Sequence, residues 1–129
     1  MNVVSAPDVP ATQLANVKLI GSATANGNDT VTFANGNTAY SISAKDSVVK
    51  LATVWTMSEF NVVGDGSYSS ANFNADSSIT VKVAATNGST AAPTCAANAG
   101  TTGETNNLNL GSCSVAGDST PSITFPEAN

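Results

Sequence analysis

One short segment limits the folds open to this chain more than any other. Residues 30–42, TVTFANGNTAYSI, carry Asn35-Gly36 between two runs in which apolar and polar side chains alternate. Alternation is the pattern of a half-buried strand, and Asn-Gly between two such runs is a strong signal for a two-residue β-hairpin turn. The segment therefore predicts a hairpin. Similar short β-prone runs, separated by Asn-Gly, Asp-Gly or proline, recur along the chain.

The expected hairpin register follows from placing the Asn-Gly pair in the turn. The expected pairs are Ala34 with Asn37, Phe33 with Thr38, and Val31 with Tyr40. One face of the hairpin is then apolar and carries Val31, Phe33, Tyr40 and Ile42. The other face carries small and polar side chains, so the turn and the alternation agree on which face is buried.

Other runs predict further strands. Residues 17–20, within 13–25, lead through Asn26-Gly27 into the hairpin and predict a three-stranded antiparallel meander. Residues 78–84 alternate strictly and predict another strand. Near the C-terminus, short strands are expected around 108–110 and at 122–125. Because proline cannot donate to a ladder, Pro121 and Pro126 indicate that the last strand is an edge strand.

The most apolar stretch, residues 47–63, admits two interpretations. Its β-branched and aromatic content favours a strand, broken near Ser58. The spacing of its apolar residues also fits a helix with Asp46 or Ser47 as N-cap. We expect the strand, with Trp55 as a core anchor rather than a ligand platform.

The whole pattern predicts an all-β chain of about eight short strands, arranged as an antiparallel β-sandwich or jelly roll. We expect residues 14–129 to form one such domain. Residues 1–13 are rich in proline and are expected to form an extended arm. The residues expected to make assembly contacts in this arm are Val3, Val4, Pro7, Val9 and Pro10.

Charge is scarce in this sequence and argues against several functions. Charged residues make up 10% of the chain, which has four lysines, no arginine, no histidine and a net charge of −5. Binding to nucleic acid or to anionic membranes depends on clusters of basic residues, so neither is expected. No apolar run is long enough to predict a membrane span. A weakly charged surface of serine, threonine and asparagine suits a protein that packs against copies of itself or onto another surface; ordinary extracellular proteins share this composition.

The N-terminal residues, MNVVSAPDVP, lack the basic and apolar regions of a signal peptide. Met1 is therefore expected to be either a native start or a cloning start in front of a mature secreted protein.

Cys95 and Cys113 are the only cysteines, and we expect them to form a disulfide. Two cysteines without histidine cannot make a four-ligand zinc site. A catalytic thiol is usually activated by a histidine, which this chain lacks. The bond would pin the loop between the two cysteines, residues 96–112, and would form in an oxidising setting. No metal site and no cofactor are expected, because Asp65 and Asp76 lack the spacing of a calcium loop.

Catalysis is not expected either. Without histidine the chain lacks the commonest general base, and its carboxylates fall mostly at turns. Three non-enzymatic hypotheses remain. The first is a virion (phage capsid) decoration protein, which binds copies of itself or a capsid protein. The second is a pilus or fimbrial subunit that assembles by strand exchange, and the third is a carbohydrate-binding or adhesin module that uses Trp55 and Tyr68 as a platform. Each places the protein on a virion surface or outside the cell.

Overall fold

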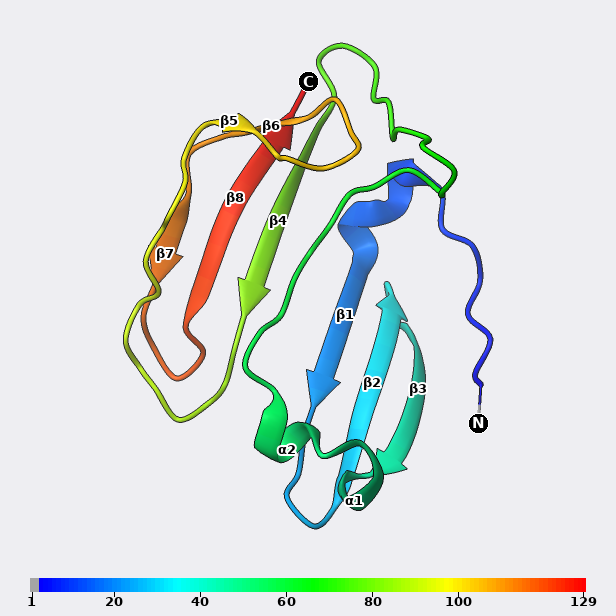
Figure 1. Ribbon diagram of the computed structural model, residues 1–129, viewed down its shortest axis with the longest axis vertical. Helices are drawn as coiled ribbons and strands as arrows, with labels where there is room; N and C mark the ends of the chain where they lie inside the picture. Colours follow the sequence, from blue (N-terminus) through cyan, green and yellow to red (C-terminus); the bar gives the residue numbers. More distant parts are fainter. Residues whose placement is uncertain (1–2) are drawn as a thin grey trace. The chain divides into compact units, whose positions relative to one another are not determined.

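A computed structural model describes residues 3–129 of the chain (Figure 1). The prediction of an all-β fold with about eight strands is confirmed, because the described residues form eight strands, one short 3₁₀ helix and two short α-helices. The chain divides into two compact units, Met1–Ser58 and Glu59–Asn129. Each unit contains one antiparallel sheet and is described by itself. Closure of the two sheets into one sandwich or jelly-roll domain stays a prediction.

The sheet of the N-terminal unit is the meander that the sequence predicts. Its strands follow one another in the order β1-β2-β3 (Figure 1). The bounds of the elements in this unit are η1 Ala11–Asn16, β1 Val17–Ser22, β2 Asn28–Asn35, β3 Thr38–Lys45, α1 Asp46–Val49 and α2 Leu51–Val54.

The hairpin of β2 and β3 has a different register from the expected one. Asn35 pairs with Thr38, so the two loop residues are Gly36 and Asn37. Gly36 has φ +58° at the first loop position, where type II′ turns place glycine. The observed register puts Phe33 opposite Tyr40, with ring centroids 6.3 Å apart. Such aromatic cross-strand pairs stabilise a sheet, whereas the expected register would have placed Phe33 opposite Thr38, without an aromatic partner.

The predicted apolar face of the hairpin is nevertheless confirmed. The register differs from the expected one by two residues, and side chains alternate with a period of two. Val31 therefore still shares a face with Phe33, now opposite Ile42 and Tyr40.

The strand prediction for residues 47–63 is wrong. Residues 46–54 form α1 and α2, which meet at Lys50 in the left-handed region with φ +58°, and residues 55–63 have no regular structure. Two carboxylates explain the helical turn despite the β-branched content. Asp29 Oδ2 accepts from Leu51 N at 3.1 Å, and Asp46 Oδ1 accepts from Ala52 N at 3.1 Å. These bonds satisfy amides at the start of α2 that have no partner within the helix.

The arm is shorter than expected. Residues 3–10 have no regular structure, and η1 begins at Ala11 with Pro10 as its N-cap. Proline is tolerated at the start of a helix because its missing N–H would be unpaired there. The expected boundary at residue 13 therefore falls inside η1, and residues 1 and 2 lie outside the described part of the chain.

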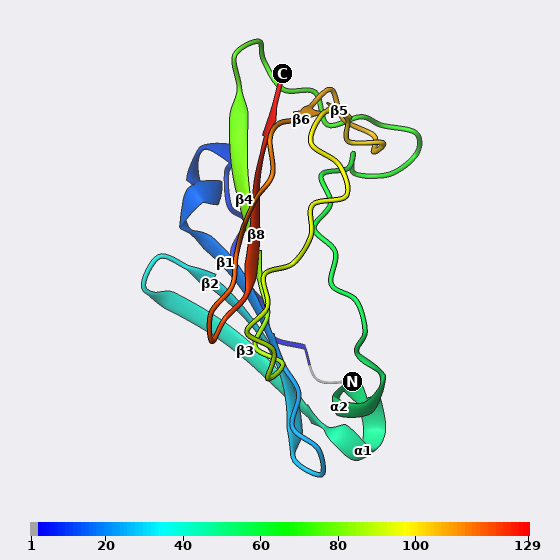
Figure 2. The same ribbon diagram turned by 90° about the vertical axis from the view of Figure 1, so that its left-hand side faces the viewer.

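The sheet of the C-terminal unit has the order β4-β8-β6-β5, with β7 also pairing with β8. Figure 2 shows the long strands β4 and β8 running side by side. The bounds of the strands are β4 Ser78–Ala84, β5 Gly100–Thr101, β6 Asn109–Leu110, β7 Ser114–Ala116 and β8 Ser122–Ala128. The predicted strand at 78–84 is thus confirmed.

The prediction that the last strand lies at an edge is wrong, because β8 is the centre of its sheet. β7 pairs with β8 only as far as Thr124, and β6 begins to pair at Glu127. Pro126 falls in the break between these partners, where its carbonyl accepts from Gly111 N at 2.8 Å. Because N–H and C=O of one residue point to the same side of a strand, the missing N–H of proline also falls in this break.

Candidate assembly surfaces

The two units together expose more surface than two compact globules of their size. The accessible area is 9148 Å², whereas two globules of the size of the units expose about 7,600 Å². Among the described residues, Val81 and Leu108 are the only buried apolar side chains. Each unit by itself therefore buries little apolar side-chain surface.

The apolar face of the β1-β2-β3 sheet is a large part of this accessible surface. Leu19 is 71% exposed and Val31 is 50% exposed. The register places Leu19 beside Phe33, and Phe33 beside Tyr40, so these side chains form one continuous band. Monomeric proteins rarely expose large contiguous apolar patches, and such patches mark interaction sites.

Trp55 covers one end of this band and is not a fully buried anchor. A side-chain carbon at Gly21 would lie 2.5 Å from Trp55 Cη2, so the ring rests directly on the backbone of β1. Trp55 Nε1 donates to Met57 O at 2.7 Å and to Ser58 Oγ at 3.1 Å. The Trp55 side chain is still 44% exposed, so it packs on the sheet but is less buried than a core anchor should be.

Tyr68 lies in the C-terminal unit, with a fully exposed side chain and φ +65°. Trp55 and Tyr68 belong to different compact units, so each is a separate exposed aromatic residue.

The N-terminal arm has no partner within the described chain. Residues 3–9 take part in no hydrogen bond with other described residues. Val3 is 82% exposed, Val4 and the two prolines are exposed, and Val9 is partly exposed. Four of the five predicted arm residues are therefore exposed, and their role in assembly stays a prediction.

The other face of the N-terminal sheet is polar and built from hydroxyl pairs. Thr30 Oγ1 and Ser43 Oγ lie 2.7 Å apart, and so do Thr32 Oγ1 and Ser41 Oγ. These hydroxyl groups hydrogen-bond to each other across the strands, so they do not need hydrogen bonds from a partner protein.

Two buried carboxylates organise one end of the N-terminal unit. Asp29 Oδ1 accepts from Thr24 N at 3.3 Å, and Asp46 Oδ2 accepts from Asn26 N at 3.4 Å. With their bonds to α2, these aspartates tie the β1-β2 loop to the helical segment. The sequence offered Asp46 only as one of two possible N-caps and did not single out Asp29, because nothing in the local pattern marks an acceptor for distant amides.

A second pair of carboxylates lies in the C-terminal unit. Glu104 Oε2 accepts from Val62 N at 2.6 Å. Glu127 is 4% exposed, and its Oε2 has no hydrogen-bond partner among the described residues. Alternation along β8 places Glu127 on the same face as Phe125, opposite Ile79. Burial raises the pKa of Glu127 above its ordinary value of 4.5, and the charge of Glu104 raises that pKa further.

The raised pKa of Glu127 predicts that the protein loses stability as the pH rises above 4.5. The folded chain holds this proton more tightly than the unfolded chain, so the stabilising contribution is complete below that pH and is lost as the pH rises through the folded-state pKa. We expect Glu127→Gln to remove this loss and to raise the free energy of unfolding at neutral pH by about 1 kcal/mol. Urea unfolding followed by circular dichroism across this pH range measures it. Glu59→Gln, which removes an exposed carboxylate, is the matched control, and a Glu127→Gln profile like that of the unsubstituted protein contradicts the prediction.

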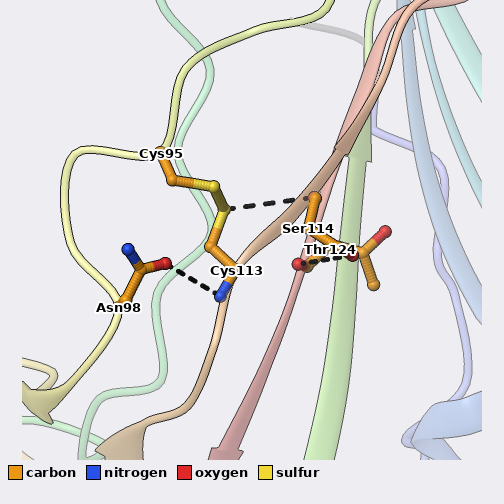
Figure 3. Close-up of a disulfide and its surroundings, with 5 residues drawn as sticks. All are labelled: Cys95, Asn98, Cys113, Ser114 and Thr124. Atoms are coloured by element: carbon orange, nitrogen blue, oxygen red, sulfur yellow. Dashed lines mark hydrogen bonds between the residues drawn. A yellow bond between two sulfur atoms is a disulfide. The ribbon is translucent and has the colours of Figure 1, made fainter.

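The predicted disulfide is present. Cys95 and Cys113 are bonded, with Cα atoms 6.1 Å apart (Figure 3). Asn98 Oδ1 accepts from Cys113 N at 3.0 Å. Cys113 Sγ also lies 4.0 Å from the Ser114 carbonyl, which is a contact only, because a disulfide sulfur carries no proton. The bond fastens the irregular segment before β5 to the start of β7.

The remaining features offer little for small-molecule chemistry. Two shallow hollows of about 240 and 270 Å³ lie in the C-terminal unit, and their linings contain no charged side chain. Within residues 3–129, no three metal-binding side chains gather into a group. No helix in the described part of the chain is long and apolar enough to cross a membrane.

Comparison with known proteins gives no relative. No protein-family model, no curated protein and no solved structure matches this chain.

Proposed function

We propose that this chain is a non-enzymatic structural protein of a surface assembly, most specifically a decoration protein on a phage capsid. One observation carries the proposal: the chain leaves 9148 Å² accessible and buries only Val81 and Leu108 among its described apolar side chains. Folding is driven mainly by burial of apolar surface, so such a chain gains most of its stability when partners cover it. The partners would be copies of itself, a capsid protein, or both.

Charge and covalent chemistry support the same proposal. A net charge of −5 without arginine disfavours contact with packaged nucleic acid, as suits a protein on the outer face of a particle. A disulfide at Cys95 and Cys113 fits an oxidising compartment, such as a released virion or the extracellular space.

A pilus or fimbrial subunit is the second candidate, and the arm favours it. Residues 3–9 leave their backbone groups without partners in the described chain, and an extended segment of this kind can add a strand to a neighbouring sheet. In a filament the exchange would run head to tail, and in a capsid decoration it would close a ring. A carbohydrate-binding module remains the third candidate, because Trp55 and Tyr68 are exposed aromatic residues.

Deleting residues 1–9 tests the assembly proposal and keeps Pro10, the N-cap of η1, whose carbonyl accepts from Gln13 N. We expect the full-length protein to form a discrete oligomer or a filament, and the deletion variant to fall to the mass of a single chain, which is below the 12.8 kDa of the full-length monomer. Light scattering measures both masses, and circular dichroism shows whether the variant keeps its sheets. A closed oligomer supports decoration and an open-ended size distribution supports a pilus. A full-length protein that is monomeric at all concentrations would refute assembly and leave glycan binding as the next function to screen.

A further inference from the structure

We propose that the outer edge of β3 is the docking edge for residues 3–9 of a second copy of the chain. The proposal rests on the assembly function above and names the surface that receives the arm. β3 lies at one margin of its sheet, with β2 between it and β1 (Figure 1).

Charge distinguishes β3 from the other long edge strands. β1, β3 and β4 each pair with a single strand of their own sheet. Lys18 lies within β1 and Lys82 within β4, whereas β3 has no charged residue before Lys45 at its end. Proteins protect exposed edges from pairing with inward or central charges, so an uncharged edge of eight residues is an open pairing surface.

The hairpin geometry identifies which backbone groups this edge offers. Residues that flank a two-residue loop form a hydrogen-bonded pair, and bonded and non-bonded pairs then alternate along the ladder. Asn35 and Thr38 flank the loop, so the backbone groups of Ala39, Ser41 and Ser43 point away from β2. The 2.7 Å contact between the hydroxyls of Ser41 and Thr32 agrees, because side chains approach most closely in non-bonded pairs.

The arm has the complementary properties. Residues 3–9 are in an irregular segment whose backbone groups have no partner in the described chain. Pro7 lacks an N–H, which a newly added edge strand tolerates on its outer side. Asp8 is the only charged residue of this segment, and Lys45, of opposite sign, is the only one on β3. No like charges therefore oppose the pairing.

The surface available also matches a stable interface between copies. The accessible area of 9148 Å² exceeds that of two globules of the size of the units by roughly 1,500 Å². A standard stable interface buries about 1,600 Å² in total, or about 800 Å² on each partner. One arm docked on β3 beside the exposed apolar band would use part of this excess on both copies.

Ser41→Pro tests the docking edge directly. It removes an N–H that points to the outer edge and leaves every β2-β3 hydrogen bond in place. Ser41→Ala is the matched control, because it loses only the hydroxyl contact with Thr32. We expect Ser41→Pro to raise the dissociation constant of the assembly roughly tenfold or more, while Ser41→Ala leaves it nearly unchanged. Light scattering over a dilution series measures this constant.

A cross-linking experiment covers the case in which Ser41→Pro fails to fold. Benzoylphenylalanine replaces Val4, and light-isotope and heavy-isotope copies are mixed before irradiation. Cross-links from position 4 to residues 38–45 of a differently labelled copy support the proposal. Cross-links confined to one copy, or to another segment, overturn it. An assembly that survives Ser41→Pro but not arm deletion refutes the β3 edge and keeps the assembly function, whereas a monomeric unsubstituted protein refutes both.

Discussion

Replacing Asp29 with alanine should destabilise the protein by about 1–3 kcal/mol, because two partly buried amides lose their acceptor at once. Thr24 N and Leu51 N donate to the two oxygens of this carboxylate. Neither amide has another partner in the described chain. A partly buried donor that loses its acceptor is not fully compensated by water, so each lost bond lowers the free energy of unfolding. The loss is expected to spread, since α2 and the β1-β2 loop are both held by this one side chain.

Urea unfolding followed by Trp55 fluorescence measures the effect, because Trp55 directly follows α2 and rests on β1. Asp65→Ala is the matched control. Asp65 is an exposed aspartate whose Oδ1 accepts from the nearby Ser69 hydroxyl at 2.8 Å, so its loss should cost less than about 0.5 kcal/mol. Equal unfolding midpoints for Asp29→Ala and Asp65→Ala would show that the buried bonds do not hold this part of the unit together.

The contrast between these aspartates shows what could be predicted from sequence. Alternation and turn residues are local signals, and they correctly predict the meander, the strand at 78–84 and the apolar face of the hairpin. The role of Asp29 depends on amides at Thr24 and Leu51, and Leu51 is 22 residues away. Nothing near Asp29 in the sequence carries that information.

The errors in secondary structure have the same origin. The β-branched residues near 46–54 prefer strands, but acceptors from Asp29 and Asp46 favour the helical turn at α2. The hairpin register was set by the Phe33-Tyr40 pair rather than by Asn35-Gly36 alone. In β8, Pro126 is tolerated only because two different short strands leave a break beside it. Each outcome depends on a partner that is distant in sequence.

The candidate surfaces were predictable in part. The two cysteines correctly indicated their bond, and the arm predicted from the proline-rich start stays a prediction. The position of Glu127 on an apolar face could not be predicted, because the registers of β4 and β6 against β8 decide which residues surround it.

Removing the disulfide should have the second large effect. We expect the double variant Cys95→Ser with Cys113→Ser to lose roughly 3 kcal/mol of stability, because the bond restricts the unfolded chain across a separation of 18 residues. The double change avoids a lone thiol. It also leaves the Asn98 bond to residue 113 N as the remaining direct link shown between these segments in Figure 3.

Denaturant unfolding with and without a reductant measures this contribution and contains its own control. Reductant should lower the unfolding midpoint of the unsubstituted protein to that of the double variant and should leave the double variant unchanged. The irregular segment before β5 has few ladder bonds of its own, so it should detach first and become open to proteolysis once the Cys95–Cys113 link is lost. The opposite outcome is a reduced protein that unfolds at the same denaturant concentration as the oxidised one, with this segment still protected from proteolysis. It would show that the disulfide contributes no measurable stability, and that hydrogen bonds such as that of Asn98 already hold the loop.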